Sequence, residues 1–231
     1  KYSDGVPVLT ADRTPVKMDL QMIVPIVFDW NRDGQPDLIV GDEDGRVAWI
    51  KNTGTRDEHN QPLFESPVYF RQQADELKCG ALATPVGVDW DGDGDWDIIS
   101  GNTAGYLEFF ENLSGPSIAR PRWNAPVRLQ VDGKDFRIMA GTNGSIQGPA
   151  EAKWGYTTLT TGDWDGDGRS DLMVNSIWGQ VIWLKNLGPI DGSSSGLPQL
   201  APAQPVIVQW PENTPLKPAW LWWTPAPGSL V

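Results

Sequence analysis

The residues most able to do chemistry are acids in three copies of one short pattern, D-x-[DN]-x-D-G-x-x-D. Oxygen-bearing side chains at positions 1, 3 and 5 can curl to face one point, and the glycine at position 6 permits a sharp turn. A backbone carbonyl at position 7 and the Asp at position 9 complete a shell of hard oxygens, which suits Ca²⁺ better than Mg²⁺. The predicted ligands are Asp29, Asn31, Asp33, Gln35 and Asp37; Asp89, Asp91, Asp93, Asp95 and Asp97; and Asp163, Asp165, Asp167, Arg169 and Asp171.

Two other interpretations of these loops are a solvated acidic turn without metal and a helix-flanked loop of the EF-hand or dockerin kind. The loops hold 12 of the 30 acidic residues, so three bound Ca²⁺ would change the net charge from -12 to -6. Without a cation these acids repel one another, which argues against an empty turn. The flanking segments are short and rich in Val and Ile, and the acid that closes the loop is at position 9, not 12, which excludes the helical interpretation.

The segments around each loop predict β-strands. In the first unit the apolar runs are Met22–Trp30, Leu38–Gly41, Arg46–Asn52 and Pro67–Phe70, bounded by Gly, Asn and Pro. Four strands per repeated unit are typical of a β-propeller blade, whereas a β-sandwich would not place the same loop in each unit. We therefore expect an all-β chain with one propeller region over 1–231. Its blades are expected at about 21–75, 81–132 and 156–210, and 1–20 and 211–231 are expected in neighbouring blades or connections.

The loop spacing, the preceding apolar strand and the Gly turn that follows resemble FG-GAP repeats, also called VCBS-type repeats. The resemblance covers about Met22 to Gly188, and Asn31 departs from it by replacing an acid. It implies integrin-α-like, calcium-binding blades of the kind found in secreted bacterial proteins, with ligands on the face opposite the calcium loops. Three blades do not close a ring, so further blades of a larger ring, or a second copy of the chain, are expected as partners.

A long polar insertion, Asp132–Tyr156, lies between the second and third units, where a repeat scaffold often carries its function. Its basic and aromatic residues suit an acidic sugar. The catalytic candidates are Arg137, Glu151, Lys153 and Tyr156, and the ligand-binding candidates are Asn143, Gln147, Trp154 and, in a turn of the third unit, Trp178. The alternative is an ordered loop that fills the space between blades, with Trp154 packed.

The composition excludes several classes of function. Acids outnumber Lys and Arg by 30 to 18, which argues against nucleic acid as a partner, and no apolar run is long enough to insert in a membrane. One cysteine, Cys79, excludes an internal disulfide and is expected to be buried. Five of the 13 tryptophans recur at repeat positions and are expected in the core: Trp30, Trp90, Trp164, Trp49 and Trp183.

The sequence therefore favours a calcium-stabilised extracellular binding or scaffold module, for a glycan or a protein. The expected location is secreted, cell-surface or periplasmic, with any signal peptide outside this chain. The alternatives are a carbohydrate-active enzyme, a polysaccharide lyase or glycoside hydrolase acting on acidic polysaccharide, and a purely structural repeat. The sequence leaves open whether the chain is catalytic.

Overall fold

The computed structural model describes residues 5–72, 75–116, 118, 120–141, 150–189 and 197–207. This part of the chain is all-β, with a single 3-10 turn, η1 (Glu151–Lys153), in the insertion. None of its helices is long and apolar enough to cross a membrane. The expected all-β class is confirmed.

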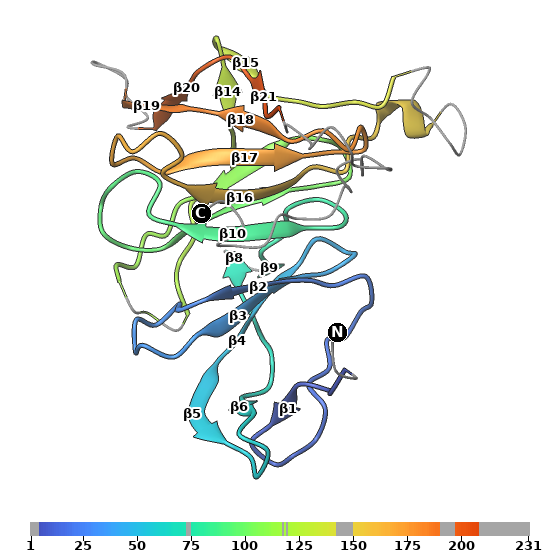
Figure 1. Ribbon diagram of the computed structural model, residues 1–231, viewed down its shortest axis with the longest axis vertical. Helices are drawn as coiled ribbons and strands as arrows, with labels where there is room; N and C mark the ends of the chain where they lie inside the picture. Colours follow the sequence, from blue (N-terminus) through green and yellow to red (C-terminus); the bar gives the residue numbers. More distant parts are fainter. Residues whose placement is uncertain are drawn as a thin grey trace, which may run out of the picture.

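Three four-stranded antiparallel sheets form the body of the structure (Figure 1). In each of them the strands follow chain order. We call each sheet with its loops a unit. The strands are β2 (Val24–Phe28), β3 (Asp37–Gly41), β4 (Val47–Ile50) and β7 (Val68–Tyr69); β10 (Thr84–Val88), β11 (Asp97–Gly101), β12 (Leu107–Phe110) and β13 (Val127–Arg128); and β16 (Thr158–Gly162), β17 (Asp171–Asn175), β18 (Ile182–Leu184) and β21 (Gln204–Pro205). The prediction of four strands per unit is thus confirmed.

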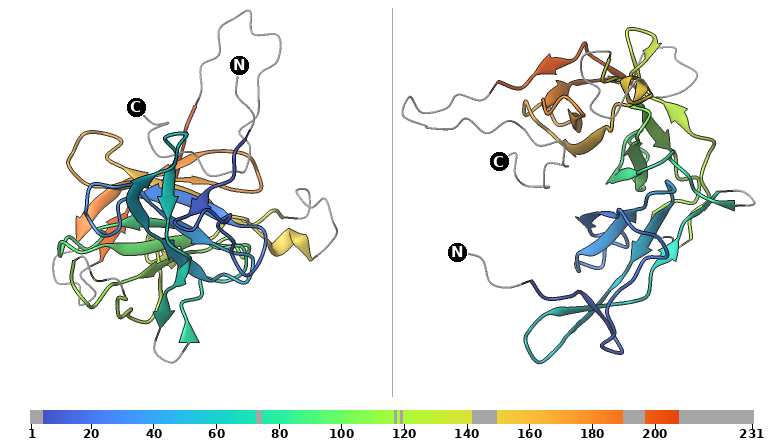
Figure 2. Two further views of the ribbon diagram at one scale, coloured as in Figure 1. Left: turned by 90° about the horizontal axis from the view of Figure 1, so that it is seen from below. Right: turned by 90° about the vertical axis from the view of Figure 1, so that its right-hand side faces the viewer.

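The sheets lie side by side in chain order, and Figure 2 shows them arranged along an arc. Strands β2 and β3 contact β10, and β10 and β11 contact β16. Two strand glycines permit a close approach between neighbouring units. A Cβ on Gly41 would lie 2.2 Å from the carbonyl oxygen of Ala83, and one on Gly101 would lie 2.2 Å from that of Thr157. The described residues do not form a closed ring of sheets.

Between the third and fourth strands of the first and third units, the chain makes a hairpin that the sequence analysis did not predict. In the first unit it is β5 (Asn52–Arg56) and β6 (Pro62–Phe64), and β6 pairs in parallel with β1 (Leu9–Thr10). In the third unit it is β19 (Asn186–Pro189) and β20 (Pro198–Leu200), and β20 pairs in parallel with β14 (Gln130–Val131). Strand β14 follows the last strand of the second sheet, so this hairpin ties the third unit to the second.

Shorter pairings complete the structure. Strand β14 also pairs with β15 (Lys134–Asp135), and β8 (Arg71–Gln72) pairs with β9 (Asp75–Glu76). These two hairpins occupy equivalent places, each directly after the fourth strand of a sheet.

The apolar core runs between the sheets and contains most of the recurring tryptophans. Trp30 and Trp90 are buried, and Trp30 packs on Trp123, whose ring centroid is 6.0 Å away in the next unit. The expectation for Trp164 is wrong, because 41% of this residue is exposed. It lies in the third of the three sheets, so no further described sheet covers it. Trp49 is buried and Trp183 is half-buried, while Cys79 is fully buried, as expected.

Candidate metal centre

The Asp at position 9 of each loop is fully buried and joins three segments of its unit. Its Oδ2 accepts a hydrogen bond from the backbone N–H of the Trp at position 2, at 3.0–3.2 Å. Its Oδ1 accepts one from the N–H of an Asn fifteen residues further on, at 2.7–2.9 Å. The three sets are Asp37 with Trp30 and Asn52, Asp97 with Trp90 and Asn112, and Asp171 with Trp164 and Asn186. Both ends of the loop are therefore fixed by protein contacts.

The partner asparagine completes the same latch in each unit. Its side-chain N–H₂ donates to the carbonyl of the residue before the Asp, and its Oδ1 accepts a backbone N–H two residues on. The pairs are Asn52 with Pro36 and Gly54, Asn112 with Trp96 and Ser114, and Asn186 with Ser170 and Gly188. The sequence analysis missed this role. The only sequence signal of this role was an Asn at the same place in every repeat.

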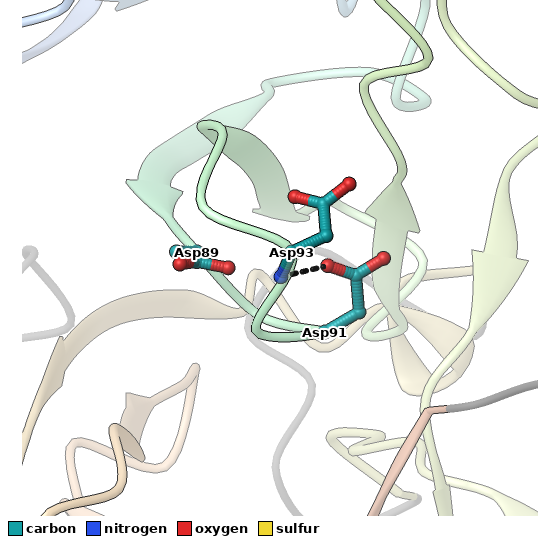
Figure 3. A group of neighbouring side chains, drawn as sticks. All are labelled: Asp89, Asp91 and Asp93. Atoms are coloured by element: carbon teal, nitrogen blue, oxygen red, sulfur yellow. Dashed lines mark hydrogen bonds between the residues drawn. The ribbon is translucent and has the colours of Figure 1, made fainter. Parts of the chain in front are cut away.

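Two of the loops gather three carboxylates to within 4.8 Å of one another: Asp89, Asp91 and Asp93 in the second, and Asp163, Asp165 and Asp171 in the third. Figure 3 shows the second group, in which the backbone N–H of Asp93 donates to Asp91. In the first loop, Asp29 accepts hydrogen bonds from the N–H groups of Asp33 and Gly34, and the amide of Asn31 donates to Asp33.

The carboxylates of the second loop have the most strongly raised pKa values of the three loops. Burial raises the pKa of Asp97 to about 7 and that of Asp95 to about 6, the latter helped by the charge of Asp93. Burial and Asp93 likewise raise the pKa of Asp91. The Oδ1 atom of Asp95 is buried without a hydrogen-bond partner. Crowded carboxylates with an unsatisfied buried oxygen fit an oxygen-liking cation such as Ca²⁺.

The third loop is already partly neutralised by its own chain. Lys185 forms an ion pair with Asp165 and a second with Asp167 at 2.9 Å, and Arg169 pairs with Asp167 at 2.6 Å. Glu111 occupies the corresponding place beside the second loop, directly before the latch asparagine. The loops therefore share a backbone frame but differ in charge.

The remaining candidates lie around the insertion and the turn after β17. The Arg137 guanidinium donates to the backbone carbonyls of Ala104 and Lys153, so it holds the insertion in place. Trp154 and Tyr156 make an edge-to-face contact, and burial and the charge of Glu151 raise the pKa of Tyr156. Glu151 is buried, whereas Lys153 is exposed. Asn143 and Gln147 lie outside the described residues.

Trp178 is 49% exposed, and its indole N–H donates to the carbonyl of Met139, which is 47% exposed. The structure thus brings Trp178 to the end of the insertion, where the ligand-binding candidates were expected. The same end holds Arg137 and Lys153, which the Arg137 hydrogen bond joins.

No protein-family model matches the chain, and neither a curated protein nor a solved structure matches it.

Proposed function

We propose that the chain is a set of calcium-stabilised β-propeller blades of the FG-GAP type, which serves as an extracellular binding module for a glycan or a protein. The observation that carries the proposal is the loop built in the same way three times. Each copy has a buried Asp latch at position 9, and two copies gather three carboxylates within 4.8 Å. Such a frame presents clustered carboxylate oxygens, the ligand type that Ca²⁺ prefers.

The packing of the sheets supports the propeller. Each sheet lies against the next through close glycine contacts. Trp164 of the third unit is exposed, whereas the equivalent Trp30 and Trp90 are buried, and Trp30 packs on Trp123 of the unit that follows. An exposed indole at a position that is otherwise buried favours a further blade, or a second copy, on this face.

Binding rather than catalysis is favoured by the state of the insertion. Arg137 is committed to two backbone carbonyls, and Glu151 is buried, so two of the four catalytic candidates serve the loop's structure. Trp178 and Met139 offer exposed apolar surface at the same end, which suits stacking on a sugar ring or an apolar side chain.

The test is thermal unfolding with calcium, with magnesium and with a chelator. With site affinities of about 10⁻⁴–10⁻³ M, calcium at about 5 mM stabilises each occupied loop by about 1–2 kcal/mol. This predicts a Tm increase of roughly 2–8 °C per occupied loop for a chain of this size. Magnesium should give a much smaller increase. Equal Tm values with calcium and with chelator, together with no calcium retained on dialysis, would refute the metal assignment.

A further inference from the structure

Two grooves on the outer rim of the sheets occupy equivalent places in the repeat. One wall of each groove is formed by the fourth strand of a sheet and the residues beside it. The other wall is a segment of the next unit that precedes that unit's own fourth strand. The first, which we call the rim groove, has a volume of about 550 Å³ and is lined by Pro67, Val68, Tyr69, Phe70, Arg71, Arg120 and Pro121. The second, of about 250 Å³, is lined by Val127, Arg128, Leu129, Gln130, Asp132, Gly133, Leu197, Pro198 and Gln199.

Strand register shows which residues correspond in the two grooves. Val68 pairs with Trp49 in the first sheet, as Val127 pairs with Phe109 in the second, so Arg71 corresponds to Gln130. On the other wall, Trp123 bridges to Asn112 as Leu200 pairs with Asn186, so Arg120 corresponds to Leu197. Both arginines of the rim groove are thus replaced by uncharged residues in the second groove.

The rim groove is basic in a chain with a net charge of -12. None of the described residues that line it is acidic, whereas the second groove contains Asp132. Arg71 and Arg120 are exposed, and neither forms an ion pair with any side chain that the structure describes, a set that does not include the side chain of Glu76 opposite Arg71. By contrast, Arg128 in the second groove pairs with Glu108 and Asp135 and stacks on Tyr106. The two guanidiniums of the rim groove are therefore available to a ligand.

The backbone along this wall adds one donor. Phe70 donates its N–H inward to the carbonyl of Val47. Because N–H groups alternate in direction along a strand, the N–H of Tyr69 points to the outer edge of β7, toward the groove. Arginine forks and an outward N–H are the groups that bind carboxylates best.

We propose that the rim groove binds a carboxylate-bearing oligosaccharide, with uronate groups held by Arg71 and Arg120. Its volume is typical of small-ligand sites, which span about 300–1,000 Å³. An extended acidic peptide is less suited, since β7 has only two residues and Pro67 has no N–H, so this edge cannot pair with an added strand. The proposal rests on the function proposed above and gives that binding module a site and a ligand chemistry.

The test is calorimetric titration of the calcium-loaded full chain with an α-1,4-linked galacturonate tetramer. The neutral galactose tetramer and hexaglutamate are titrated in parallel. Arg71→Gln and Arg120→Leu introduce the residues of the second groove and should each weaken binding of the galacturonate tetramer by about tenfold or more. Arg122→Gln, an exposed arginine two residues from Arg120 and outside the groove lining, is the matched control and should bind like the wild type. Glu76→Gln removes the acid registered opposite Arg71 and should strengthen binding.

Three results would overturn the proposal. The first is binding of the neutral tetramer as tight as that of the galacturonate tetramer. The second is binding of hexaglutamate that depends on Arg71 and Arg120 as much as binding of the galacturonate tetramer does. The third is wild-type affinity for the galacturonate tetramer in Arg71→Gln and Arg120→Leu. The third result would indicate that calcium in the loops, and not the groove, holds the carboxylates of the galacturonate tetramer. The calcium effect on Tm is measured on the same samples. A normal increase of Tm with calcium, but no galacturonate binding, would reject only the groove proposal. The absence of any effect of calcium on Tm would reject the proposed function.

Discussion

At the residue scale, the Asp at position 9 closes its loop and supports the frame that gathers the side chains at positions 1, 3 and 5. Asp97 is fully buried and accepts backbone hydrogen bonds from both sides of its loop, so it holds the loop closed whether or not a metal is present. Positions 1, 3 and 5 are more exposed and are gathered by that frame. The loop is therefore largely preorganised, and a bound cation would have to order only a few carboxylates, which would favour binding.

Lys185 is predicted to compete with calcium in the third loop. Its ammonium group pairs with Asp165 and Asp167, and hydrogen bonds to Asp165 and then Asp167 raise its pKa. Calcium must displace it. Lys185→Gln should therefore strengthen calcium binding at this loop several-fold, seen in calorimetric titration. Lys134→Gln, an exposed lysine on β15, is the control and should change nothing. Unchanged calcium affinity in Lys185→Gln would contradict the competition.

Proton binding in the second loop predicts a pH dependence. In the calcium-free fold the pKa values of Asp97 and Asp95 are raised to about 7 and about 6, above the ordinary 3.8. The folded state then holds more protons than the unfolded state, so these groups stabilise the calcium-free fold at low pH and lose that contribution as pH rises through 7. Calcium requires the deprotonated acids. The gain in Tm from calcium should thus be large at about pH 8 and small at about pH 5.5.

The matching measurement is a pair of melting curves, with and without calcium, at each pH. Asp95→Asn should flatten the dependence, because it removes one of the two groups. The same calcium gain at both pH values would contradict the assignment of these acids to the site.

The residue pattern predicted carboxylate groups in three loops, of which the described residues gather two, and it did not predict the neighbours of these groups. Acid spacing within nine residues is local, so the grouping of Asp89, Asp91 and Asp93 follows from sequence alone. Lys185 and Asn186 come from the third strand and the hairpin, far along the chain from the loop they contact. Their effect depends on which side chain a distant strand brings to the loop, which no local pattern states.

At the element scale, sequence predicted the strands with apolar alternation and missed those without it. Strands β3 and β11 are nearly all buried and read clearly as strands. Strand β5, NTGTR, is polar and contains glycine, and its hairpin is stabilised by parallel pairing with β1, more than fifty positions away. Such pairing depends on a segment far along the chain, so the sequence of β5 does not indicate it. The third strand of the first unit was accordingly predicted to end at Asn52, whereas β4 ends at Ile50.

Close glycine contacts between sheets predict which substitutions separate the units. A Cβ on Gly101 would lie 2.2 Å from the backbone carbonyl oxygen of Thr157, which cannot move without shifting the third sheet. Gly101→Ala should therefore cost about 1–3 kcal/mol or more of unfolding free energy. Gly162→Ala, in a strand where a Cβ would meet nothing within 4 Å, is the matched control and should be close to neutral. Urea unfolding measures both, and equal stabilities would show that the sheets do not pack this closely.

At the scale of the whole molecule, the acidic residues are concentrated in the loops of neighbouring units. Of the 30 acids, 12 lie in three loops that follow one another along the arc, so much of the charge of -12 is concentrated there. Arg32 of the first loop donates to the carbonyl of Gly94 in the second and stacks on Trp96, which ties neighbouring loops together. Cations in the loops would lower the repulsion between units as well as within each loop.

The open face of the third sheet predicts self-association of the isolated chain. Trp164 is 41% exposed at a position where Trp30 and Trp90 are buried, and apolar surface of this kind is stabilised by a partner sheet. Sedimentation should therefore give a mass above 25.4 kDa at micromolar concentration. Trp164→Gln should shift the chain toward the monomer. Trp178→Gln removes an indole of similar exposure, 49%, at the end of the insertion, and should leave the mass unchanged. A monomer at all concentrations, or equal effects of both substitutions, would show that the Trp164 face does not pack against another sheet.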